Sequence, residues 1–269
     1  MRSVKRIHVI SPRLLKILGG ELVETPVGLL PDKGAYVWGV ADRKLGAGIF
    51  NHLMLVGRVA ENLAKALIEK DPQLSDSLNL CWVVEAAILH DIVKLYGSLR
   101  EALSVEDKFL LNLSPNMKEN DEDTEAVGVG WLKELGFALK VQEAICDHFP
   151  KQVRDDLYWQ IVLVADFMAS QKIMSVKDRL DDVSQRWTVS SSPDKLPRVK
   201  PAEFAISRGV IEEVANKIFT KLGVTDCEFI SKYDLNNPNS MTRTERFLRH
   251  TRDKQLEQRA IRHVSHFMS

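Results

Sequence analysis

Two histidines and two aspartates interrupt apolar segments of this chain and are the residues best suited to chemistry. His90 and Asp91 stand together in the otherwise apolar run VVEAAILHDIVK, His52 begins the striped run NHLMLVGRVAENLAKAL, and Asp166 lies inside IVLVADFMA. A buried carboxylate is costly unless a proton, a cationic partner or a metal ion neutralises it. Imidazole and carboxylate are also the ligands that hold divalent transition metals inside helical bundles. The pattern therefore predicts a metal site formed by these four side chains.

Each of these residues alone also has a purely structural interpretation. A single histidine on an apolar face is more often a hydrogen-bonded core residue, and a single buried aspartate is more often a helix cap or a salt-bridge partner. The metal interpretation depends on their occurrence together on separate core-facing helices. His148, at the end of ALKVQEAICDHF, is a further candidate, with a core histidine that caps its helix before Pro150 as the alternative.

Helix signals distribute these residues over several elements. The His52 helix should end at Lys70, before Asp71-Pro72, and the His90-Asp91 helix should be closed by Gly97. Two later helices should carry the other candidates, His148 on Leu139–Phe149 and Asp166 on Leu157–Lys172. Further helices are expected after Ser11-Pro12, from the Ser104 capping box to Leu113, over Glu125–Gly136, after a Ser175 cap, over Arg208–Leu222 and over roughly Thr242–Phe267.

The order of these residues resembles a known signature. His52, then His90-Asp91, then Asp166 is similar to the H…HD…D pattern of the HD-domain metal-dependent phosphohydrolases, and HDIVK at His90–Lys94 resembles the HDIGK form of that family. The resemblance covers roughly Ile49–Lys172. It implies an all-α fold, an HD-domain helical bundle that we place at 49–187. A loop-rich flap over 1–48, with or without a small β-hairpin, should precede the bundle, and a helical C-terminal extension over 188–269 should follow it.

The resemblance also implies a reaction and roles. A metal-activated water would hydrolyse a phosphate ester, with a nucleotide as the expected small-molecule substrate. Asp91 would ligate the metal and help orient the attacking water, while Lys94, one helical turn later, would place a positive charge near the phosphate or else be a surface lysine. His148 would contact phosphate or water, or act as general acid for the leaving group. Arg43, in the flap, would bind phosphate through its guanidinium, unless the flap only packs over the bundle.

The expected number of metal ions follows from one departure from the family pattern. Binuclear relatives carry a further histidine at the position that Thr124 occupies here, in the run TEAVG. A neutral hydroxyl is a poor transition-metal ligand compared with imidazole. We therefore expect one divalent ion per chain, without a prediction of whether it is Mn, Co, Ni, Fe, Zn or Mg.

Composition is consistent with a globular cytoplasmic protein. The 269 residues are 45% hydrophobic, with a formal net charge of +0 and a pI near 7.1, so no overall charge attracts nucleic acid or membrane. The cysteines, Cys81, Cys146 and Cys227, have no paired spacing, which favours a reduced compartment. No apolar run approaches the roughly 20 residues that a membrane span needs.

Two other functions are compatible with the same sequence. A non-catalytic HD-type signalling or adaptor module should have lost some of the four ligands, whereas this chain keeps them all. A nucleic-acid-directed phosphodiesterase would use the predicted terminal helix, Thr242–Phe267, in which basic residues outnumber acidic ones. A helix packed on the bundle with a solvated basic face is the favoured interpretation of that segment. No sequence feature specifies an oligomeric state.

Overall fold

The computed structural model describes residues 48–91, 132, 137–145, 149–189, 199–246 and 249–250. Within these ranges the regular structure is helical and no β-strand occurs, which confirms the predicted all-α fold; an isolated bridge joins Ala169 and Ile173. The elements are α3 (Gly48–Lys70), the 3₁₀ helix η1 (Pro72–Asp76), α4 (Leu80–Leu89), α8 (Leu139–Ala144), α9 (Leu157–Asp166), α10 (Val176–Trp187), α11 (Pro201–Leu222), α12 (Asp226–Lys232) and the 3₁₀ helix η2 (Pro238–Ser240).

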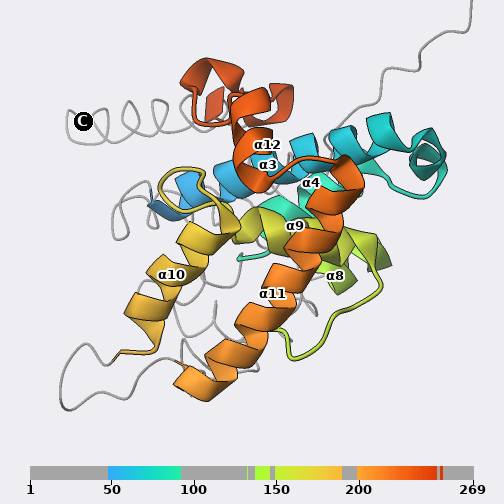
Figure 1. Ribbon diagram of the computed structural model, residues 1–269. Helices are drawn as coiled ribbons and strands as arrows, with labels where there is room; N and C mark the ends of the chain where they lie inside the picture. Colours follow the sequence, from blue (N-terminus) through green and yellow to red (C-terminus); the bar gives the residue numbers. More distant parts are fainter. Residues whose placement is uncertain are drawn as a thin grey trace, which may run out of the picture.

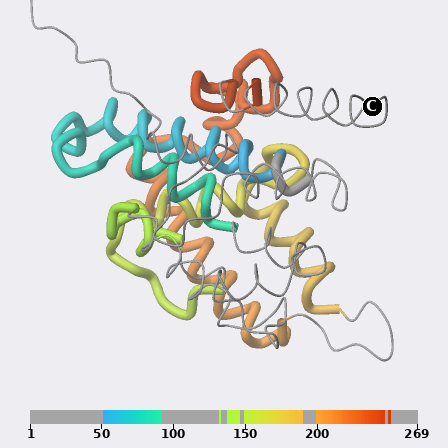
Figure 2. Tube along the Cα trace, turned by 180° about the vertical axis from the view of Figure 1, so that it is seen from behind, coloured from blue at the N-terminus to red at the C-terminus, as the bar shows by residue number. Residues whose placement is uncertain are grey.

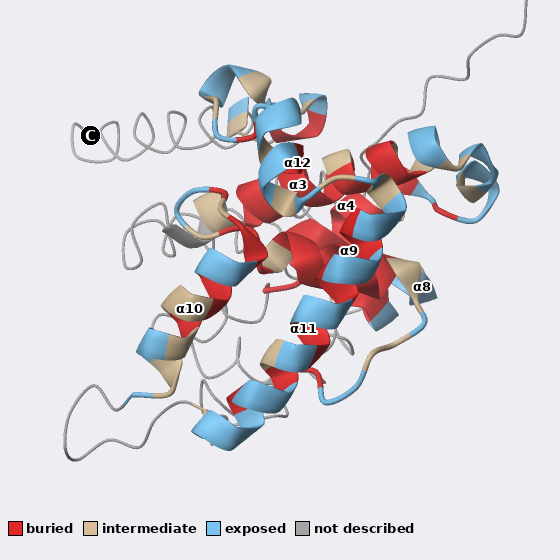
Figure 3. Ribbon diagram, in the orientation of Figure 1, coloured by how far each residue is buried: buried red, intermediate tan, exposed pale blue. Residues whose placement is uncertain are grey.

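The centre of the molecule is formed by α3, α4 and α9, which pack against one another (Figure 1). Both α4 and α9 are apolar around most of their circumference, and every residue from Val83 to Leu89 and from Tyr158 to Ala165 is buried. A helix that is apolar all round is stable only when other elements cover every side. The burial-coloured view shows these two helices almost entirely in the buried class (Figure 3).

α11 packs against α9 and α3, and α10 packs against α11; both α10 and α11 keep an exposed face (Figure 3). The buried apolar stripe of α11 recurs at helical spacing and includes Phe204, Ile211, Val214 and Ile218. The helix begins at Pro201 rather than at the predicted Arg208, because proline at the first helical position costs no hydrogen bond. It ends at Gly223, whose φ of 72° and ψ of 29° place it in the left-handed region that glycine adopts most easily.

A close approach brings α3 against α4. A Cβ atom added to Gly57 would lie 2.9 Å from Cγ1 of Ile88, closer than real Cβ contacts. Ile88 is buried, so it has little room to move. The absence of a side chain at this position therefore sets the separation of the two helices that carry three of the four predicted ligands.

Several helix ends agree with the sequence predictions and others differ. α3 ends at Lys70 as expected, and the Ser175 side chain accepts the predicted capping hydrogen bond from the Asp178 amide. α3 begins earlier than expected, at Gly48, so that His52 lies beyond its first turn. α8 ends at Ala144 rather than at Phe149. α9 ends at Asp166 rather than at Lys172, because the chain turns into a compact loop closed by the Met174 amide donating to Met168 O.

The segment after α11 contains a helix that the sequence analysis missed. α12 begins with a capping box, in which the Thr225 and Glu228 side chains each bond the other residue's backbone amide. This S/T-x-x-E signal was present in the sequence and could have located the helix. Farther on, the backbone is helical over 243–246 and Thr242 Oγ1 accepts from the Glu245 amide, so the terminal helix starts where predicted.

Other predicted elements lie outside the described residues. They are the flap, the helix after Ser104, the helix over Glu125–Gly136 apart from the buried Leu132, and most of the terminal helix beyond 250. Among the helices that are described, none combines the length and apolar character that crossing a membrane requires.

Candidate metal centre

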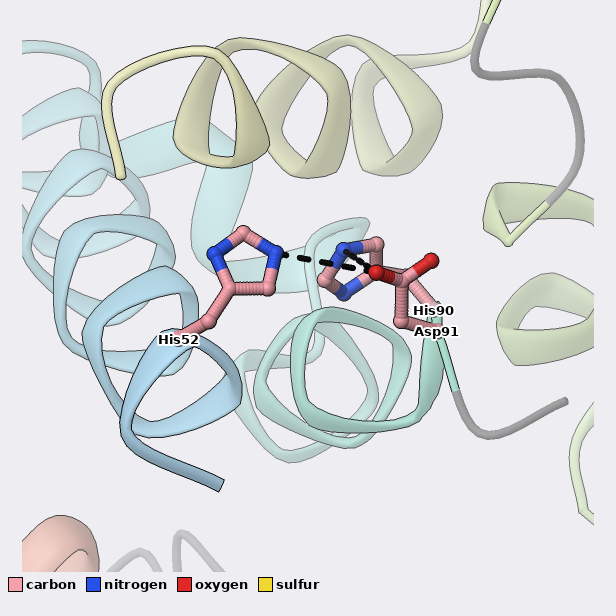
Figure 4. A group of neighbouring side chains, drawn as sticks. All are labelled: His52, His90 and Asp91. Carbon is pink, nitrogen blue, oxygen red and sulfur yellow. Dashed lines mark ion pairs between the residues drawn. The ribbon is translucent and has the colours of Figure 1, made fainter. Parts of the chain in front are cut away.

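His52 enters the site from the N-terminal part of α3. The core-facing side of that helix carries Leu53, Val56 and Ala60, all fully buried, which fixes the rotation of the helix about its axis. The imidazole is directed toward the end of α4 (Figure 4). Its side chain remains 16% exposed, so His52 forms part of the open edge of the site.

His90 and Asp91 stand at the point where α4 stops. We predicted a helix that continued through this pair to Gly97, and that prediction is wrong because α4 ends at Leu89 and both residues lie in a turn. His90 Nδ1 lies 2.7 Å from Ala87 O. In a continuing α-helix, this carbonyl would accept a hydrogen bond from the Asp91 amide. The His90 side chain thus bonds a carbonyl in the last turn of α4, and two buried polar residues follow the end of the helix.

The same contact determines the tautomer of His90. A carbonyl oxygen only accepts, so Nδ1 must carry the proton that is donated to Ala87 O. In the neutral ring this leaves the Nε2 lone pair facing the centre of the site. Metal-ligating histidines are held in this way, by a hydrogen bond from the other ring nitrogen to a carbonyl.

Asp166 reaches the site from the opposite side, at the last residue of α9. Its Oδ1 lies 3.2 Å from His52 Nε2 and 3.4 Å from His90 Nε2. Burial raises the pKa of Asp166, but the His90 and His52 rings, in their protonated forms, lower it by more, so the pKa of this carboxyl lies well below its usual range when no metal is bound. The position between these side chains therefore favours a positive charge, either on the imidazoles or on a bound cation.

The tightest group is formed by His52, His90 and Asp91, whose potential ligand atoms all lie within 4.8 Å of one another. Asp91 Oδ2 is 3.7 Å from Nε2 of each histidine (Figure 4). Asp166 does not belong to this tightest group and joins it through its contacts with both imidazoles. The four predicted ligands, from three separate helix ends, thus lie close together, and their role as metal ligands stays a prediction.

The two Asp166 distances, 3.2 and 3.4 Å, fit a shared cation better than direct ion pairs, and the two Asp91 distances, 3.7 Å, are too long for ion-paired hydrogen bonds. Charge-assisted N–H···O bonds are about 2.7–2.9 Å long, shorter than every contact in this group. Two ligands that are each about 2.1 Å from one metal ion are separated by roughly 3.0–3.4 Å at right or tetrahedral angles. A neutral Nε2 and a carboxylate oxygen also repel one another unless a cation lies between them. Two imidazoles and two carboxylates therefore form a suitable donor set for a divalent transition metal.

The remaining predicted site residues lie outside the described part of the chain. These are Arg43, Lys94, Thr124 and His148. The roles that the sequence suggested for them stay predictions.

Comparison with protein families agrees with this geometry. The HD domain family matches residues 49–180, a range that begins in α3, ends in α10 and contains all four converging side chains. Residues 49–180 are an HD domain. The match confirms the family resemblance that the H…HD…D pattern suggested. No significant match was found among curated proteins or solved structures.

Two features that shape the HD-domain site were not recognised in the sequence. Gly57 sets the approach of α3 to α4, and its only sequence signal is a glycine in an otherwise strongly helical run. α3 itself also carries buried polar residues, including Arg58, which is 3% exposed. A single arginine among apolar residues carries no signal of its partner, because that partner lies far away in the sequence.

Proposed function

We propose that this protein is a metal-dependent phosphohydrolase that cleaves a phosphate ester, with a nucleotide as the favoured substrate. One observation carries the proposal: His52, His90, Asp91 and Asp166 converge with ring-nitrogen to carboxylate distances of 3.2–3.7 Å. A module that had become a non-catalytic adaptor would have no reason to keep this costly group of buried polar residues intact. The ligand set therefore supports an enzyme over an adaptor.

The proposed ligands differ in how far they are exposed to solvent, and this sets the side from which substrate would approach. A divalent metal held by His52, His90, Asp91 and Asp166 would supply Lewis acidity toward a water molecule and a phosphoryl oxygen. His90 and Asp91 form the closed inner side, since each is about 5% exposed or less. His52 and Asp166 are 16% and 15% exposed, so substrate would approach along the edge between α3 and the end of α9.

Groups outside the metal ligands complete the proposed chemistry. Asp91 would accept a hydrogen bond from the attacking water and so orient it. Lys94 would place its ammonium near the phosphate, and Arg43 would bind phosphate oxygens bidentately. His148 would donate a proton to the leaving group. Because Thr124 occupies the position of a further histidine in binuclear relatives, we propose one tightly bound ion per chain.

The proposal is tested with purified protein that has been stripped by a chelator and reloaded separately with Mn²⁺, Co²⁺, Ni²⁺ or Mg²⁺. Each sample is assayed against nucleoside mono-, di- and triphosphates, cyclic dinucleotides and a chromogenic phosphodiester. We expect hydrolysis that depends on the added metal, about one ion per chain, and loss of both in Asp91→Ala with helical content retained. Equal metal content in the wild type and Asp91→Ala would contradict the proposed site.

A further inference from the structure

The chain after α11 returns to the metal centre without supplying a ligand to it. We call Asp226–Arg246 together with Arg249 the strap. It begins with α12, passes through η2 and reaches the first described turn of the terminal helix. Figures 1 and 2, from opposite sides, both show it lying beside α3. Its polar contacts with the described bundle fall on two places, the N-terminal half of α3, which carries His52, and the loop that follows Asp166.

The contact with α3 is a buried, fork-shaped ion pair. Arg58 Nε and the neighbouring terminal nitrogen of the guanidinium donate to the two carboxylate oxygens of Glu245 at 2.6 and 2.7 Å. The other terminal nitrogen donates to Leu235 O at 2.6 Å. Arg58 and Glu245 are 3% and 2% exposed. A planar guanidinium with two parallel bonds accepts only one orientation of its partner, so this pair fixes how α3 is rotated relative to the strap.

A second bond reaches the residue beside the metal ligand. Arg249 Nε donates to Glu245 Oε1 at 2.8 Å, and its terminal nitrogen donates to Asn51 Oδ1 at 2.9 Å. Asn51 immediately precedes His52. Asn51 and Arg58 are seven positions apart, about two helical turns, and therefore share one face of α3. Holding that face at two points fixes the direction in which His52 projects.

The strap also holds the loop that leaves Asp166. The Asn236 side chain donates to Ile173 O at 2.8 Å and accepts from the Ile173 amide at 2.9 Å. One turn farther on, Asp226 Oδ2 accepts from the Val176 amide at 2.9 Å. The two Asn236 bonds tie both backbone groups of Ile173 to a single side chain. The loop position is thereby coupled to the strap.

The strap itself has an independent anchor in the core. Phe229 and Leu235 are essentially fully buried, and the Phe229 ring packs 5.8 Å from that of Phe219 on α11. This burial holds the strap against the bundle whether or not the polar contacts form. The polar contacts are therefore free to set geometry, because they are not needed to keep the segment attached.

We infer that the strap is a positioning element for the metal centre. It hydrogen-bonds to Asn51 and Arg58 on one face of α3 and to Ile173 in the loop after Asp166. These bonds set the separation between His52 Nε2 and Asp166 Oδ1, which is 3.2 Å. Asn51, Arg58, Asn236, Glu245 and Arg249 are its positioning residues. The inference rests on the proposed metal site and adds to it a set of residues far from the H…HD…D pattern in sequence.

The experiment uses the full chain with Co²⁺ as the probe, because its visible absorption reports the geometry of its ligands. The variants are Asn236→Ala and Arg249→Ala, both of which lie near the surface and leave the buried Arg58–Glu245 pair in place. We expect about tenfold weaker Co²⁺ binding and a changed absorption spectrum, as for other residues that orient metal ligands, with circular dichroism unchanged.

The matched control is Tyr158→Phe. It removes the hydroxyl that accepts from the Asn79 amide and donates to Ser77 O, at the far end of α9 from Asp166. It should lower the free energy of unfolding and leave the Co²⁺ spectrum and affinity unchanged. Wild-type affinity and spectrum in both strap variants would overturn the inference, as would equal changes in Tyr158→Phe. A wild type that binds no Co²⁺ would overturn the proposed metal site first, and this inference with it.

Discussion

The two ends of α9 each carry an aspartate beside nitrogen-bearing side chains, and the two arrangements differ in kind. Asp156, before the first turn, accepts from Lys140 Nζ at 2.7 Å and from the Trp159 amide at 3.0 Å, and it is partly exposed. Asp166, at the last turn, is near two imidazoles at 3.2 and 3.4 Å. The first set of distances describes completed hydrogen bonds, and the second describes ligands gathered around a common position.

A lowered pKa does not separate these two cases. Burial raises the pKa of Asp156, but the hydrogen bonds from Lys140 and from the Trp159 amide lower it by more. The pKa of Asp156 is therefore lowered overall, as is that of Asp166. The partner types and the distances make the distinction. The comparison therefore assigns Asp156 a structural role, as a helix cap, and supports the proposed role of Asp166 as a metal ligand.

The largest expected effect separates the two aspartates directly. Asp166→Ala should remove a ligand, so metal content should fall to background and hydrolysis by roughly a thousandfold. Asp156→Ala should cost about 1 kcal/mol of unfolding free energy through loss of the cap and leave metal content unchanged. Elemental analysis and urea unfolding of both proteins make the comparison. Similar metal loss in the two variants would end the distinction between the two ends of α9.

A smaller effect is expected where α3 approaches α4. Gly57→Ala would place a methyl group 2.9 Å from Ile88 Cγ1, and overpacking of this kind costs about 1–3 kcal/mol. The matched control is Gly209→Ala on α11, where the added methyl group meets nothing within 4 Å. That change should stabilise the helix by up to about 1 kcal/mol.

Metal binding sharpens this second comparison. Since Gly57 sets the spacing between the helices of His52 and of His90-Asp91, its alanine variant should also bind Co²⁺ more weakly, whereas Gly209→Ala should bind as the wild type does. Urea midpoints and Co²⁺ titrations provide the two measurements. Equal stability of the two variants would show that the Ile88 side chain can move away from the added methyl group without displacing α4.

The smallest expected effect is a pH dependence of stability. The folded-state pKa values of Asp156 and Asp166 are both lowered, so each carboxylate contributes stability that is fully present above the unfolded pKa of about 3.9 and is lost as the pH falls through the folded value. Between pH 5 and pH 2, Asp156→Ala should therefore lose less unfolding free energy than the wild type. Identical slopes would mean that Asp156 gains nothing from Lys140 in the folded protein.

Much of the fold could be predicted because helix formation is largely local. The end of α3 before Asp71-Pro72 and the Ser175 cap were both readable from a few adjacent residues. The missed α12 was readable in the same way, from Thr225 and Glu228. By contrast, the ends of α4 and α9 could not be read, because apolar periodicity continues past Leu89 and Asp166 while the backbone bonds are taken by the His90 ring and by the loop closed at Met174.

The sequence by itself selected the residues of the centre. Residue types, order and apolar surroundings were enough to select His52, His90, Asp91 and Asp166 and to indicate an HD-type bundle, since a polar residue in a core requires a partner wherever the core is built. Only the tertiary structure decided which atoms meet. The His90 tautomer depends on a carbonyl exposed by a helix end, and the bond between Arg249 and Asn51 joins residues 198 positions apart. The Arg249–Asn51 bond leaves no local pattern, because packing, rather than chain neighbourhood, brings its partners together.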